Sequence, residues 1–170
     1  MAAPSGPVQL TTEGSSDWAH WGNATAADFD HKAGVTQRIS NFVSVLGGTP
    51  ARYANNSVGF TWTDGTPTAS ATNSTTGLFV SGQGQGFRIT APADTSSRTL
   101  RVYVGVWRTQ GQLVAHLSDG SAVDFTDTSL TNSAGVTTLG VYTLTYRAGS
   151  AGQTLTVSFT QNTATAGNVT

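Results

Sequence analysis

The sequence predicts an all-β fold, an antiparallel β-sandwich of the jelly-roll type. Apolar and polar residues alternate with a period of two in several segments, and turn sequences such as DG, GG and PAD separate these segments. No helical pattern is long enough to connect parallel strands, so the expected strands, about nine of them, run antiparallel. Long connections early in the chain and short ones late favour a jelly roll over an immunoglobulin-type sandwich.

The first half of the chain contains four expected strands, which lie within VTQRISNFVSVLG, SVGFTWTDG, TGLFVSG and GFRITAPAD. In the second of these, Val58, Phe60 and Trp62 share one parity, which predicts Trp62 in the core. The segment TAADFDHKA has a slight helical tendency, but it is too short to form a stable helix.

The second half has the clearest alternation. In RTLRVYVGVW the apolar face is expected to point inward, and it consists of Leu100, Val102, Val104 and Val106. The sequence TQG then predicts a hairpin turn into QLVAHLSDG, whose inward residues are Leu113, Ala115 and Leu117. The segments VYTLTYRA and QTLTVSFT repeat this pattern and are joined by AGSAG. Tyr142, Leu144 and Tyr146 share one face of the first, and Leu155, Val157 and Phe159 share one face of the second.

Length and charge limit the functional classes. A chain of 170 residues predicts one domain over residues 1–170, with residues 1–6 as a disordered leader. Eight Lys and Arg against nine Asp and Glu give a net charge of −1, so no basic surface for nucleic acid or for a membrane is expected. The absence of cysteine excludes disulfides, thiolate catalysis and cysteine-bound zinc.

Several segments carry a resemblance to a known kind of module, and they are DWAHWG, DHK, YANN, WTDGTPTAS, RTLRVYVGVW, LSDGSA and YTLTYRAGSAGQTLTV. Across nearly its whole length the chain resembles an accessory module of large secreted bacterial proteins, similar to the galactose-binding-like jelly rolls that include many carbohydrate-binding modules. The resemblance implies an extracellular location and neighbouring domains in a larger chain, and it assigns no binding residues. The composition, rich in Thr, Ser, Gly and Asn and with one lysine, is also typical of such proteins.

The segment DWAHWG contains half of the tryptophans in the chain. A sugar binds through its apolar faces to aromatic rings and through its hydroxyls to polar side chains, so Trp18, His20 and Trp21 are candidate ligand-binding residues. In an extended segment Trp18 and His20 point to one side and Trp21 to the other. One tryptophan is expected to close the core and the other to be offered to a ligand, while a histidine here is more often structural.

A second candidate surface lies at the end of RTLRVYVGVW. Trp107 falls on the face opposite the aliphatic residues and precedes Arg108, and Tyr103 shares the outer face. A Tyr, Trp and Arg face suits ligand binding, so Tyr103, Trp107 and Arg108 are candidate residues. The alternative is that Trp107 packs beneath a loop, and the sequence leaves both possibilities open.

Calcium is the expected cofactor, if the protein has one. Asp28 and Asp30 are two residues apart near Asn23, and alternating carboxylates in a loop can provide oxygen ligands for a structural Ca²⁺. A second acidic group lies at Asp119, Asp124 and Asp127. Neither matches an EF-hand loop, and the alternative for both is that Asp caps turns.

No catalytic motif is evident, so the chain is expected not to be an enzyme. The sequence predicts a lectin-like, carbohydrate-binding accessory module that binds a polysaccharide or oligosaccharide. The alternative is a structural or adhesive spacer of a bacterial surface protein with no small ligand. A covalent variant of this spacer would cross-link Lys32 to an Asn or Asp.

Overall fold

The computed structural model describes residues 1–4, 6–163 and 166–170, and these form two compact units. Unit 1 comprises residues 1–4, 42–49, 80–163 and 166–170, and unit 2 comprises residues 6–41 and 50–79. The sequence predicts a single domain because no linker interrupts it. One domain over residues 1–170 stays a prediction, and the division into units falls beside short strands, where no linker sequence marks it.

The strands of unit 1 are β4 (Val43–Val45), β10 (Gly86–Ala93), β11 (Arg98–Trp107), β12 (Gly111–Leu117), β13 (Phe125–Asp127), β14 (Thr138–Tyr146), β15 (Gln153–Gln161) and β16 (Asn168–Val169). The elements of unit 2 are β1 (Val8–Gln9), α1 (Leu10–Glu13), β2 (Ala19–Trp21), β3 (Phe29–Lys32), β5 (Ala51–Tyr53), β6 (Phe60–Trp62), β7 (Gly65–Thr66), β8 (Ala71–Ser74) and β9 (Gly77–Phe79). The predicted all-β class is confirmed. Within the described ranges, no helix is long and apolar enough to span a membrane.

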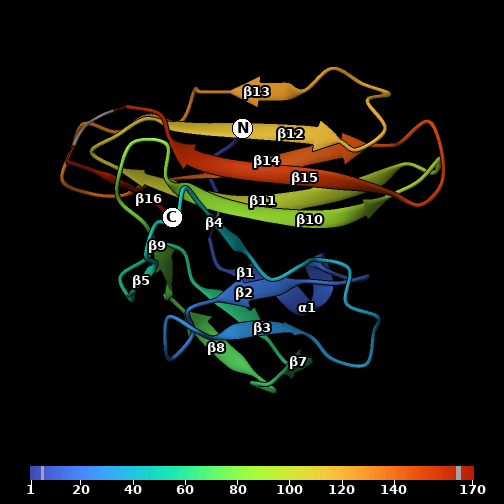
Figure 1. The fold of residues 1–170 in the computed structure, drawn as a ribbon. Helices are drawn as coiled ribbons and strands as arrows, with labels where there is room; N and C mark the ends of the chain where they lie inside the picture. Colours follow the sequence, from blue (N-terminus) through green and yellow to red (C-terminus); the bar gives the residue numbers. More distant parts are fainter. Residues whose placement is uncertain (5, 164–165) are drawn as a thin grey trace. The chain divides into compact units, whose positions relative to one another are not determined.

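Unit 1 is sandwich-like and has two main antiparallel sheets (Figure 1). One has the strand order β13-β12-β15-β10-β4 and the other β14-β11-β16. The inward faces predicted for three long strands are buried, apart from the half-buried Val102. The buried residues are Leu100, Val104 and Val106 on β11, Leu113, Ala115 and Leu117 on β12, and Leu155, Val157 and Phe159 on β15.

The predicted hairpin between β11 and β12 is wrong. β11 pairs with β14 and β16, whereas β12 pairs with β13 and β15, so the connection at Arg108–Gln110 passes from one sheet to the other. The AGSAG segment likewise connects β14 to a strand of the other sheet. Alternation with a period of two shows which face of a strand is buried. The same alternation occurs whether two strands are neighbours in one sheet or lie in facing sheets, so it does not predict which strands pair.

Unit 2 consists of small sheets with short strands, whose orders are β1-β6-β8, β2-β3-β7 and β5-β9. In the pairing of β2 with β3, His20 lies opposite Asp30 and Trp21 opposite Phe29. The slight helical tendency of TAADFDHKA is overridden, because Asp28 accepts hydrogen bonds from the backbone N–H groups of Ala24 and Thr25 and turns the chain into β3.

The start of the chain is paired with unit 1. Ala2 forms an antiparallel bridge with Val141, with backbone hydrogen bonds in both directions. The disordered leader predicted for residues 1–6 includes this bridge and residue 5, which lies outside the described residues, and it stays a prediction.

Candidate functional site

The four tryptophans divide into two buried and two half-buried residues. Trp62 is fully buried and Trp18 is 2% exposed, and their rings pack at 5.3 Å in the core of unit 2, as predicted for Trp62. Both indole N–H groups are used, Trp62 on the Thr68 carbonyl and Trp18 on the Asp64 carboxylate. Trp21 and Trp107 are half-buried, so they are the two indoles with surface available to a ligand.

An aromatic strip, formed by Trp21, Phe29 and His31, lies on the outward face of β2 and β3. Trp21 and Phe29 are cross-strand partners, and their ring centroids lie 5.8 Å apart with planes inclined by only 13°. The His31 ring lies 5.2 Å from that of Phe29. All three side chains are half-buried, so the strip presents a row of partly exposed rings.

Polar groups hold the strip in place. The Trp21 Nε1–H donates to Asn41 Oδ1 at 2.8 Å, and Asn41 is exposed. Asp17 accepts hydrogen bonds from the backbone N–H groups of Arg38 and Ile39, which fastens the segment leading to Asn41. The indole is therefore held in one orientation before any ligand arrives.

His20 is separated from the strip. It points to the opposite face of β2 and is 6% exposed, with the rings of Phe60 and Trp62 at 5.5 and 5.1 Å. Burial lowers the pKa of His20 to about 4, although Asp30 and a backbone hydrogen bond with Thr76 act in the opposite direction. The structure thus places Trp18 and His20 in the core and only Trp21 of this group at the surface.

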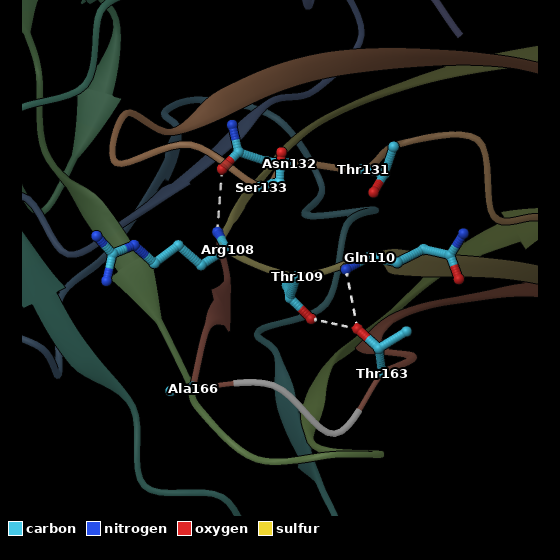
Figure 2. Close-up of a pocket in the computed structure, with 8 residues that line it drawn as sticks. All are labelled: Arg108, Thr109, Gln110, Thr131, Asn132, Ser133, Thr163 and Ala166. Carbon is cyan, nitrogen blue, oxygen red and sulfur yellow. Dashed lines mark hydrogen bonds between the residues drawn. The ribbon is translucent and has the colours of Figure 1, made fainter.

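The second candidate surface is a shallow depression of about 590 Å³ in unit 1, here named the Arg108 depression (Figure 2). It lies where the β11–β12, β13–β14 and β15–β16 connections meet. Seven of its eight lining residues have polar side chains, and the lining consists of Arg108, Thr109, Gln110, Thr131, Asn132, Ser133, Thr163 and Ala166. Hydroxyl, amide and guanidinium groups of this kind can pair with the hydroxyls of a sugar.

Side-chain hydrogen bonds join the three connections. Asn132 Oδ1 accepts from the Arg108 backbone N–H at 3.0 Å, and its Nδ2 donates to Val136 and Thr138. The hydroxyls of Thr109 and Thr163 lie 3.0 Å apart. Figure 2 marks this hydrogen bond with a dashed line. Arg108 itself has a φ of 52°, a conformation that a non-glycine residue adopts rarely. The rim of the depression is thus held by side chains from separate parts of the chain.

Trp107 and Arg108 act as a pair next to this depression. The Arg108 guanidinium carbon lies 4.8 Å from the centre of the Trp107 ring, a cation–π arrangement, and the indole N–H donates to the Gly135 carbonyl at 3.1 Å. Trp107 is therefore outside the aliphatic core, and it contacts the loop before β14. Tyr103 shares the outer face but lies four residues away on β11, about 13 Å along the strand, so it belongs to a different part of the face.

The two predicted calcium ligands, Asp28 and Asp30, make different hydrogen bonds and differ in burial. Asp28 caps a turn, with one oxygen accepting from two backbone N–H groups and the other from the Thr25 hydroxyl at 2.6 Å. These hydrogen bonds lower its pKa. Asp30 is fully buried and accepts from the Thr68 N–H at 2.9 Å. In the part of the chain that the structure describes, no group of three His, Cys, Asp or Glu residues is placed to hold a metal, and calcium binding stays a prediction.

The second acidic group is also divided. Asp119 accepts from Ser121, and Asp124 contacts the imidazole of His116 at 2.7 Å. Asp127 accepts hydrogen bonds from Ser129 and from the Tyr142 hydroxyl. The turn-capping alternative describes Asp119 and Asp127 well.

Sequence reasoning missed most of the residues around the two indoles. Phe29 and His31 have the parity of the outward face in FDHK, so pairing that segment with DWAHWG would have identified them. No local signal marks Asn41, Asn132 or Thr163, because each reaches its site from a distant part of the chain.

No protein-family model and no curated protein matches this sequence. Among solved structures, the fold is similar to the enzymatically active domain of tailspike protein 4 from bacteriophage CBA120, with a TM-score of 0.43 and 9% identity. The match covers 76% of this chain and 18% of the tailspike chain. It contradicts the expectation that the chain is not an enzyme, which is therefore withdrawn. At this level of similarity it assigns no activity, substrate or residue role to the present chain.

Proposed function

We propose that this protein is a lectin-like carbohydrate-binding module of the jelly-roll type from a secreted, multidomain bacterial protein. One observation carries the proposal: two of the four tryptophans form a core, while each unit keeps one indole half-buried beside polar groups. Because tryptophan is rarely fully buried in proteins, partial exposure alone marks no site, and the hydrogen bond that fixes each ring is the informative feature. A partly exposed indole held by a hydrogen bond in one orientation suits stacking against the apolar face of a sugar ring.

The chemistry of both surfaces suits a neutral or weakly charged glycan. The aromatic strip offers rings next to Asn41, and the Arg108 depression offers hydroxyl and amide groups next to Trp107. The net charge of −1 provides little long-range attraction for a highly charged ligand. The strip is the primary candidate, because its Trp21 and Phe29 rings are nearly parallel and Trp21 is fixed by Asn41.

A glycan array followed by affinity electrophoresis tests the proposal, with Trp21→Ala and Trp107→Ala as separate variants. Loss of a central aromatic contact typically costs about 2 kcal/mol, roughly a thirty-fold weaker Kd. We expect this loss for Trp21→Ala at the strip, and for Trp107→Ala if the depression also binds glycan. Phe125→Ala is the matched control, since Phe125 is an aromatic residue on β13 with 48% exposure that belongs to neither surface.

Two results would contradict the proposal. The first is the absence of saturable binding to any glycan by the unmodified chain. The second is equal binding by the unmodified chain and both tryptophan variants. Either result would favour the structural or adhesive spacer, for which a half-buried indole needs no ligand.

A further inference from the structure

We propose that Lys32 and Asp64 of unit 2 become joined by an intramolecular amide bond, a modification that is independent of glycan binding. Lys32 is the single lysine of the sequence, and its Nζ forms an ion pair with Asp64 Oδ2. The two side chains are only 12% and 28% exposed. The lysine is thus directed at a carboxylate that is only partly exposed.

Backbone hydrogen bonds fix the two partners relative to each other. The Lys32 N–H donates to the Trp18 carbonyl at 3.1 Å, and the N–H of the next residue, Ala33, donates to the Asp64 carbonyl at 2.7 Å. Lys32 Nζ also donates to the Thr11 carbonyl at 3.3 Å. A nucleophile and an electrophile held in this way react as if at very high local concentration, because the entropy of bringing them together is already lost on folding.

The other carboxylate oxygen of Asp64 is held by two donors. Asp64 Oδ1 accepts from the Thr11 hydroxyl at 2.6 Å and from the Trp18 indole N–H at 2.9 Å. When a nucleophile adds to a carboxyl carbon, negative charge develops on such an oxygen, and fixed donors stabilise it. Thr11 and Trp18 therefore provide for Oδ1 what an oxyanion hole provides in acyl transfer.

The reaction starts from the ion pair. Burial raises the pKa of Asp64, but hydrogen bonds from Lys32, Thr11 and Trp18 outweigh it and hold the pKa below its ordinary value. The Lys32 ammonium first gives a proton to Oδ2, and the neutral amine then adds to Cγ and forms the C–N bond. The added nitrogen passes a second proton to Oδ2, the Cγ–Oδ2 bond breaks, and one water leaves. One ammonium and one carboxylate thus give one amide and one water, without an oxidant or another reactant.

Within this proposal we assign the second proton transfer to Asp30, a buried carboxylate on the same strand as Lys32. It lies two residues before Lys32 on β3, so both side chains point to the same face of the strand. Asp30 is fully buried, and its Oδ2 has no hydrogen-bond partner among residues 1–4, 6–163 and 166–170. A carboxylate in this role must come within hydrogen-bond reach of the reacting nitrogen, take its proton and return it to the leaving oxygen.

Digestion with a lysine-specific protease gives a direct test, because the chain has one lysine. The purified chain is denatured, its intact mass is measured, and it is then digested. The cross-linked chain is expected to be lighter than its sequence by one water and to resist cleavage after Lys32. A full-mass chain that is cleaved there into two fragments would overturn the proposal.

Variants separate the cross-link from other losses of water. Asp64 precedes Gly65, and such a pair can also lose water by cyclising on its own backbone, so Lys32→Arg is the matched control that retains the positive charge. We expect Lys32→Arg to have full mass and Asp64→Asn to lose ammonia instead of water. Asp30→Asn is expected to slow formation of the cross-link at least ten-fold. Loss of water in Lys32→Arg would assign the mass change to the Asp64–Gly65 backbone and refute the cross-link.

Discussion

The two units bury their cores with different chemistry. Unit 1 repeats aliphatic residues along long strands, so that Leu113, Val157 and Val106 are each one member of a row. Unit 2 has strands of two to four residues and packs the indoles of Trp18 and Trp62 instead. Long paired strands distribute apolar burial over many positions, whereas short strands concentrate it in a few large side chains.

Polar groups in the two cores differ as well. In unit 2, His20 and Asp30 are buried cross-strand partners, and Lys32 forms an ion pair with Asp64. Because buried charges and imidazoles respond to pH while methyl groups do not, the two units are expected to differ in their response to mutation and to acid. The following three experiments test this difference.

The largest effect is expected from Trp62→Ala. Removing a fully buried indole leaves a large cavity and typically costs about 3–5 kcal/mol, which should unfold unit 2 while unit 1 keeps its structure. Amide hydrogen exchange measured by peptide would show lost protection over residues 6–41 and 50–79 alone. Leu113→Ala is the matched change in unit 1, and it should reduce protection there. Equal loss over both units in either variant would show that the cores are not independent.

Acid should destabilise unit 2 through His20. Its pKa is about 4 in the folded chain and 6.5 when unperturbed, so between these values the unfolded state binds a proton that the folded state does not. Stability must then fall as the pH falls from 6.5 to 4, by about 3 kcal/mol, and this term levels off below pH 4. Urea unfolding followed by tryptophan fluorescence measures it.

A comparison of variants isolates the contribution of His20. His20→Phe retains an aromatic ring between Phe60 and Trp62 and should remove most of the pH dependence between 4 and 6.5. His116→Gln is the control, because the His116 side chain is 50% exposed whereas His20 is buried. An unchanged slope in His20→Phe would contradict the burial argument.

The smallest effect is expected from Tyr142→Phe, which removes one polar contact from the aliphatic unit. The Tyr142 hydroxyl donates to Asp127 Oδ1 at 2.7 Å while the ring is 2% exposed. Burial and the Asp127 carboxylate raise the pKa of Tyr142, so the hydroxyl stays protonated over the tested pH range. Its loss should cost about 1–2 kcal/mol, without the acid dependence of unit 2. A urea midpoint equal to that of the unmodified chain would show that Asp127 is equally well satisfied by Ser129.

What the sequence predicts well is decided by strand length. On β11, β12 and β15 alternation continues for seven residues or more, and it assigns nearly every buried position correctly. It fails to assign strands to sheets, as at Arg108–Gln110, because pairing partners come from distant segments. In unit 2 three or four residues are too few to show a period, and capping by Asp28 decided the conformation of its segment.

The candidate sites show the same limit. Strand geometry predicts that Trp18 and Trp21 lie on opposite sides, and Trp18 is buried while Trp21 is half-buried. That Trp21 is offered to a ligand stays a prediction. The pairing of Lys32 with Asp64 could not be predicted, because it depends on β3 lying next to the turn after β6. Polar residues that meet from distant segments follow no periodic pattern in the sequence, so their contact cannot be predicted from it.

The positions of the two units along the sequence also determine the order in which they can fold during synthesis. All residues of unit 2 precede residue 80, whereas β10 of unit 1 pairs along its length with β15, which ends at Gln161. A ribosome adds about 5–20 residues per second from the N-terminus. Unit 2 can therefore fold before most of unit 1 has been synthesised. Strand β4 of unit 1 can pair with β10 only after β10 has been synthesised. The aromatic and ionic core would be complete before the first aliphatic sheet exists.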